Sequence, residues 1–146
     1  LTAGCVRMTE ILARDGEGAT HLLRVTVTGA ASEGDARRVA KSLVNSPLIK
    51  TMVNGADPNV GRILMAIGKC VDCTIAPDKT SASINGSQVV REGIRVDFDD
   101  PVVRAALATE PVDILVELGV GSASAMAFGC DLSQGYVDEN AAYYSS

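Results

Sequence analysis

The chain has 146 residues, of which 47% are hydrophobic and 21% charged, and its formal net charge is -5 at pH 7. This length and balance are typical of one globular domain, residues 1–146, and they exclude wholesale disorder, collagen and coiled coils. It contains three Tyr, two Phe and no Trp. Because proteins that grip single-stranded nucleic acid combine a basic groove with aromatic stacking, we expect no nucleic-acid partner.

Three features of the sequence bear on the cellular compartment of the protein. The apolar stretch Val112–Val120 contains two acidic residues and is far shorter than the roughly 20 apolar residues that span a bilayer, so we expect no membrane insertion. The first residues lack the pattern of a secretory signal. We therefore expect a cytoplasmic protein with reduced cysteines, and disulfide pairing is the alternative. The four cysteines are Cys5, Cys70, Cys73 and Cys130.

The first third of the chain is predicted to form two helices separated by a strand. Apolar residues at helical spacing predict a helix over Ala3–Arg14. The alternation of β-branched and polar residues over Leu23–Thr28 predicts a half-buried strand that ends at Gly29. Ser32 is a suitable N-cap for a helix that runs to about Val44.

The middle of the chain is expected to contain shorter elements. We predict a short strand over Ile49–Val53 and a helix over Pro58–Ile67, since Pro58 suits a first helical turn. Short strands are expected over Ser83–Asn85 and Ile94–Val96. The dipeptide Asn85-Gly86 is a strong turn signal between them.

Towards the end of the chain we predict a helix over Asp100–Ala108, then strands over Val112–Leu118 and Ser122–Gly129 that form an antiparallel hairpin. Residues 133–146 are polar and carry the three tyrosines. The order of elements indicates an α/β (α+β mixed) fold, in which helices are layered on a mixed, largely antiparallel sheet.

Cys70 and Cys73 form a C-x-x-C motif, which is compatible with a redox or zinc site. The motif follows a predicted helix C-terminus, where the helix dipole opposes a thiolate, and no second pair of ligands stands at metal spacing. We therefore favour structural cysteines and predict neither a metal nor a cofactor. The only histidine, His21, is interpreted as a surface or capping residue.

Candidate binding residues lie near both ends of the chain. Glu17 stands between two glycines, so that a ligand could approach the backbone and meet a charge; a solvated turn glutamate is the alternative. The predicted helix start at Asp57–Arg62 offers amides to an anion. Asn140 and Ser145 carry donors and acceptors that suit a small polar ligand such as an amino acid.

Four segments resemble, in order, the arginine-biosynthesis glutamate N-acetyltransferases, also called ornithine acetyltransferases, and together they cover nearly the whole chain. They are DGEGATH at Asp15–His21, VNSPLIKT at Val44–Thr51, DPNVGRILMAIG at Asp57–Gly68 and AFGCDLSQGYVDENAAYYSS at Ala127–Ser146.

The resemblance implies an ornithine acetyltransferase-like fold and acetyl transfer through an N-terminal threonine. Members of this family cut their own precursor before a threonine, and the resulting α and β chains usually assemble as α2β2. The new N-terminal threonine takes the acetyl group from N2-acetylornithine, or in some members from acetyl-CoA. It then passes this group to glutamate, and an N-terminal threonine suits that role because its own amino group or a nearby base can accept the hydroxyl proton.

The resemblance also implies roles for individual residues. Glu17 matches a substrate-contacting glutamate, and Asn140 and Ser145 match residues that line the substrate site, with Ser146 as the alternative to Ser145 if the ends are aligned. No catalytic residue is assigned, because Thr2 lacks the sequence context of the nucleophile. The chain therefore resembles the C-terminal part of a β chain, whose expected partners are the α chain and the remaining β-chain segment. A non-catalytic amino-acid-binding descendant, or an acyltransferase with another acyl donor, are the alternatives.

Overall fold

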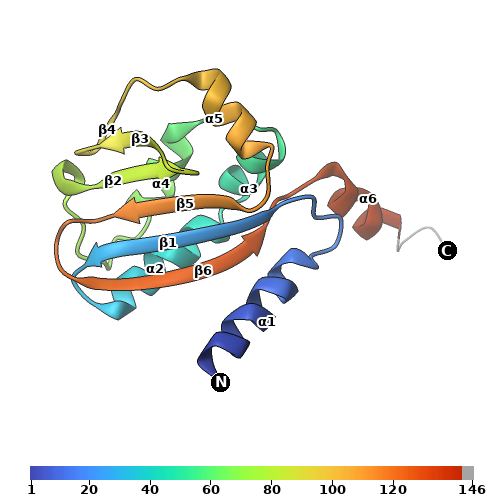
Figure 1. Cartoon of the computed structure of the whole chain (residues 1–146), viewed down its shortest axis with the longest axis horizontal. Helices are drawn as coiled ribbons and strands as arrows, with labels where there is room; N and C mark the ends of the chain where they lie inside the picture. The colour runs from blue at the N-terminus through green and yellow to red at the C-terminus, as the bar shows by residue number, and fades with distance from the viewer. Residues whose placement is uncertain (143–146) are drawn as a thin grey trace.

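A computed structural model describes residues 1–142 and shows one six-stranded sheet with helices packed on it (Figure 1). The strands are β1 (Leu22–Ala30), β2 (Ser81–Ile84), β3 (Ser87–Arg91), β4 (Ile94–Arg95), β5 (Val112–Glu117) and β6 (Ala123–Cys130). The helices are α1 (Thr2–Arg14), α2 (Glu33–Val44), α3 (Pro47–Asn54), α4 (Val60–Gly68), α5 (Asp100–Leu107) and α6 (Gln134–Ala142), with a short 3-10 helix, η1, at Pro77–Lys79.

The strand order is β4-β3-β2-β5-β1-β6. Among the described residues, only the pair β1 and β5 is parallel, and the four other neighbouring pairs are antiparallel. The expected mixed, largely antiparallel sheet is therefore confirmed. In the part of the chain that the structure describes, no helix is long and apolar enough to cross a membrane.

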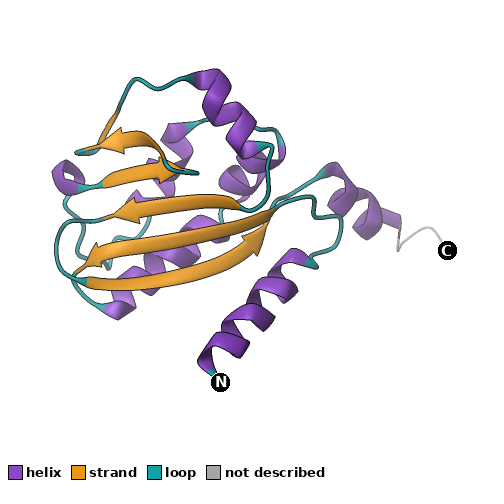
Figure 2. Ribbon diagram, viewed as in Figure 1, coloured by secondary structure: helices purple, strands orange, loops and turns teal. Residues whose placement is uncertain are grey.

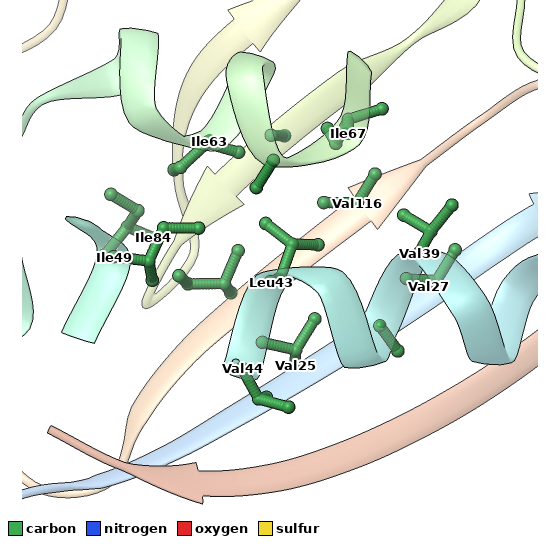
Figure 3. Packing of buried hydrophobic residues seen from close by; sticks show 14 of the residues in the cluster. Val25, Val27, Val39, Leu43, Val44, Ile49, Ile63, Ile67, Ile84 and Val116 are labelled. Carbon is green, nitrogen blue, oxygen red and sulfur yellow. The ribbon is translucent and has the colours of Figure 1, made fainter. Parts of the chain in front are cut away.

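The hydrophobic core lies between the sheet and the helices α2, α3 and α4 (Figure 3). Val25 and Val27 of β1 point to this side and are fully buried, as the alternating pattern of that strand predicts. Leu43 of α2 packs into the same core. The prediction for α2 is confirmed, including its N-cap, since the hydroxyl of Ser32 accepts a hydrogen bond from the Asp35 amide.

The predicted strand over Ile49–Val53 is wrong, because these residues belong to helix α3. The hydroxyl of Ser46 accepts a hydrogen bond from the Ile49 amide, and Pro47 occupies the first turn, where its missing N–H costs nothing. Ile49, Met52 and Val53 are all buried. Their spacing of three and four residues is that of a helix face, which a short apolar run conceals.

The predicted hairpin of the last two strands is also wrong, because β1 lies between them. Val25 is paired with Ile114 of β5 on one side and with Ala127 of β6 on the other. The connection from β5 to β6 passes around the end of β1 (Figure 2), where the amides of Val120 and Gly121 donate to the Gly29 carbonyl. Alternation of apolar residues predicts each strand but does not specify its neighbour.

The remaining differences concern element boundaries and two elements that the sequence does not predict, strand β3 and helix α6. The turn at Asn85-Gly86 is confirmed, but it joins β2 to β3 and not to a strand at Ile94. Helix α4 begins at Val60, two residues later than predicted. Helix α1 is confirmed and contains no buried residue.

The core can be tested by comparing two leucines. We expect Leu43→Ala to lower the free energy of unfolding by about 2–5 kcal/mol, since it leaves a cavity at a fully buried position. Leu12→Ala, at a position on α1 that is 72% exposed, should change it by less than about 0.5 kcal/mol. Urea denaturation followed by circular dichroism measures both, and equal losses would contradict the assignment of the core.

Candidate functional site

Several segments that are distant in the sequence meet at one end of the central strands. The loop between α1 and β1, the end of β6, and the helices α3 and α6 all approach this end of the sheet (Figure 1). Between them lies a cavity of about 330 Å³. Its walls are formed by Gly16, Glu17, Asn45, Pro47, Lys50, Cys130, Asp131, Leu132 and Tyr136.

The loop before β1 is pressed against the start of α6. Gly18 has a positive φ of 64°, and a Cβ atom at this position would overlap the backbone amide of Tyr136. The hydroxyl of the buried Ser133 donates to the Gly18 carbonyl and accepts from the Tyr136 amide at 3.2 Å. Glycine is therefore required at residue 18 both for its backbone conformation and for the close approach of α6.

This contact brings together two of the three residues that the sequence singled out. The side-chain amide nitrogen of Asn140 donates to Glu17 Oε2 at 3.1 Å and to the Tyr136 carbonyl at 2.8 Å. Glu17 and Asn140 are both exposed, so their polar groups are accessible to a ligand. The third residue, Ser145, and its alternative Ser146 lie outside the described residues.

The carboxylate of Asp131 holds the same loop in place through hydrogen bonds. This residue is 3% exposed and follows the last residue of β6. Its carboxylate accepts hydrogen bonds from the amides of Thr20 and His21 at 2.8 and 2.9 Å, and from the side chains of Thr20 and Asn54. One carboxylate thus joins β6, the loop before β1 and the end of α3.

Two opposing effects set the pKa of Asp131. Burial favours the neutral acid and raises the pKa, whereas hydrogen bonds from Thr20, Asn54 and the backbone of His21 favour the carboxylate. The hydrogen bonds prevail and lower the pKa to about 2. The sequence assigned no role to Asp131, because that role depends on donors from two separate segments, the loop before β1 and α3.

His21 belongs to this network and is not a surface residue, since its side chain is only 17% exposed. Its Nδ1 lies 2.8 Å from the Thr20 hydroxyl and 3.3 Å from Asp131 Oδ2. A nucleophile, base and carboxylate triad needs the two ring nitrogens to bridge the hydroxyl and the acid. Here the same nitrogen faces both, so the arrangement holds the loop and is not a proton relay.

The other candidates lie elsewhere. The side chain of Arg62, at the start of α4, donates to the Leu48 carbonyl at 2.9 Å and takes no part in the cavity. None of the four cysteines forms a disulfide. Burial, reinforced by the charge of Asp35, raises the pKa of the Cys73 thiol, which is the opposite of what a reactive thiolate requires.

Comparison with known proteins matches this chain to one family, by a family profile and by individual relatives. The ArgJ family profile matches residues 1–145. The arginine biosynthesis bifunctional protein ArgJ of Rhodococcoides fascians is 47% identical over 141 residues, which are 95% of this chain and 35% of that protein. The glutamate N-acetyltransferase of Methanopyrus kandleri is 44% identical over 143 residues, 95% of this chain and 36% of that protein.

The same result comes from solved structures. The crystal structure of the arginine biosynthesis bifunctional protein ArgJ from Bacillus halodurans is similar with a TM-score of 0.92 and 39% identity. The match covers 97% of this chain and 66% of that one. The chain spans about a third of the length of the curated relatives that it matches.

The anchoring role of Asp131 predicts a dependence of stability on pH. The pKa of Asp131 is about 2 in the folded state and about 3.9 in the unfolded state. Its carboxylate therefore contributes roughly 2 kcal/mol to the free energy of unfolding above about pH 5. This contribution is lost as the pH falls from about 5 towards 2.

Urea denaturation at a series of pH values measures this effect. Asp131→Asn should lower the free energy of unfolding at pH 7 by roughly the 2 kcal/mol that the carboxylate contributes. It should also make the stability less dependent on pH below about 5, because the substituted amide does not ionise. The matched variant Asp72→Asn, at an exposed site, should leave the profile unchanged. A wild-type acid limb that survives in Asp131→Asn would refute the role of this carboxylate.

Proposed function

This chain belongs to the ArgJ family, and on that basis we propose that it forms part of a bifunctional ornithine acetyltransferase. In this proposal the enzyme moves an acetyl group from N2-acetylornithine, or from acetyl-CoA, to glutamate, and it acts in the cytoplasm. The chain supplies residues that bind the substrate. The α chain and the remaining β-chain segment, in an α2β2 assembly, supply the nucleophilic threonine.

The observation that carries the proposal is the contact between Glu17 and Asn140, which are 123 residues apart in the sequence and meet beside a cavity. The Glu17 carboxylate suits the ammonium group of an amino acid, since hydrogen bonds between ionised partners are the strong ones. Asn140 holds Glu17 Oε2 and keeps the carboxylate at the cavity rim. These two residues bind and orient the amino acid, and neither makes or breaks a bond.

In the proposed reaction the threonine hydroxyl attacks the acetyl carbonyl, its proton passes to a base, and the amine of ornithine leaves with a proton. The amine of glutamate then attacks the acyl-threonine ester and restores the hydroxyl. Both half-reactions place an amino acid in the same orientation relative to the nucleophile. Glu17, which lines the cavity, suits the first half-reaction, because the one ammonium group of N2-acetylornithine is on its side chain, away from the acetylated α-nitrogen that reacts.

The division of labour can be tested on protein purified from its source. We expect intact mass measurement to find partner polypeptides, and the complex to transfer labelled acetyl from N2-acetylornithine to glutamate. The 146-residue chain alone should show no turnover, since the proposal places the nucleophile outside it. Turnover by the isolated chain would contradict that division. A complex that binds ornithine without transferring acetyl would favour a non-catalytic binding protein, and one that prefers longer acyl groups would favour another donor.

The role of Glu17 predicts a kinetic effect in the complete enzyme. Glu17→Ala should raise the KM for the amino-acid substrate about tenfold or more, because a lost charge-assisted hydrogen bond costs about 1.5–3 kcal/mol. Steady-state kinetics with N2-acetylornithine measure this change. Glu33→Ala, which removes an exposed carboxylate from the first turn of α2, is the control and should leave the KM unchanged. An unaltered KM in Glu17→Ala would make Glu17 a solvated turn residue.

A further inference from the structure

The cavity beside Glu17 also contains a cation, Lys50, to which neither the sequence patterns nor the resemblance assigned a role. Lys50 lies on α3 and is half-buried. Its backbone is fixed against the end of β6, since its carbonyl accepts a hydrogen bond from the Leu132 amide at 3.3 Å. Within residues 1–142, no acidic side chain forms an ion pair with its ammonium group.

Among residues 1–142, three charged side chains line the cavity: Glu17, Lys50 and Asp131. The Asp131 carboxylate is already occupied by hydrogen bonds from Thr20, His21 and Asn54. Glu17 receives one hydrogen bond from Asn140 and is exposed. One negative and one positive group therefore remain in the cavity wall for a ligand.

We infer that this cavity binds an amino acid by both of its charged groups, with Lys50 receiving a carboxylate while Glu17 receives the ammonium. The inference rests on the proposed function and extends it by assigning the carboxylate subsite. N2-acetylornithine carries one side-chain ammonium and one carboxylate, which matches the two available charges of the wall. Glutamate offers a carboxylate to Lys50, and its α-amine stays free to attack the acyl-threonine.

The surroundings of Lys50 support this assignment. A volume of about 330 Å³ falls within the range of cavities that hold small ligands. A half-buried lysine attracts a carboxylate more strongly than an exposed one, because water screens the pair less. The Asp131 network fixes the end of α3 through Asn54, four residues after Lys50, so the ammonium group projects from a rigid helix.

The test compares two ligands that differ only in the carboxylate: N2-acetyl-L-ornithine and N-acetylputrescine, which has the same ammonium and acetamide groups. Calorimetry with the full 146-residue chain should show that the wild type binds N2-acetyl-L-ornithine about tenfold or more tightly than N-acetylputrescine. Lys50→Met should abolish this preference and leave the affinity for N-acetylputrescine unchanged. Lys50→Arg should restore most of it, since the charge is retained.

Lys69→Met is the matched control, because Lys69 is exposed after α4 and does not line the cavity. It should retain the wild-type preference. Thermal melts by circular dichroism identify any variant that fails to fold. If Lys50→Met does not fold, the preference of Lys50→Arg for N2-acetyl-L-ornithine over N-acetylputrescine decides whether Lys50 binds the carboxylate.

Several outcomes would overturn the inference. Equal binding of the two ligands by the wild type, or a preference that survives in Lys50→Met, would exclude Lys50 as the carboxylate subsite. The absence of binding of either ligand to the folded wild-type chain would exclude the cavity itself. The proposed function is judged separately by acetyl transfer in the purified complex, so transfer without carboxylate preference would refute only the inference about Lys50.

Discussion

The buried carboxylate of Asp131 is the constraint on which the site depends. A buried charge is costly unless hydrogen bonds replace the water that it loses, and here the donors come from two separate segments, the loop before β1 with Thr20 and His21 and the end of α3 with Asn54. Each donor can satisfy Asp131 only if its own segment is in place. The carboxylate therefore fixes the relative positions of the loop that carries Glu17 and the helix that carries Lys50.

The sheet provides the frame for this arrangement. Because β1 pairs antiparallel with β6, the loop that precedes β1 and the segment that follows β6 emerge side by side at the same end (Figure 1). The close approach at Gly18 then allows α6 to pack directly on that loop, which places Asn140 against Glu17. An interior strand and a glycine contact thus bring together residues from opposite ends of the chain.

Local signals in the sequence were enough to predict helix α2. Ser32 and the apolar face of α2 were sufficient, because both act within one helix. The strand predicted over Ile49–Val53 is wrong because three apolar residues in a run of five suit either period, whereas Ser46 and Pro47 before them mark the start of a helix. The hairpin prediction failed because the choice of a neighbouring strand is a tertiary property.

The candidate site shows the same limit. Glu17 and Asn140 were singled out from a glycine turn, a polar C-terminal segment and a family resemblance, and their hydrogen bond is a feature of the structure alone. Asp131 and Lys50 lie in segments that carry the resemblance, but no local pattern assigns them a role, since one is defined by donors from distant segments and the other by the cavity it faces. The error over α3 also concealed Lys50, because a strand would not have placed it on a helix beside the cavity.

Titration of the isotope-labelled chain with N2-acetyl-L-ornithine, followed by backbone amide chemical shifts, tests the central claim that this end of the sheet is an amino-acid site. The account predicts that the largest shift changes fall at Gly16, Glu17, Lys50 and Tyr136, which all line the cavity. It would be contradicted if the largest changes fell instead in the groove between α1 and α2, around Val6 and Lys41, or if saturating ligand produced no changes at all.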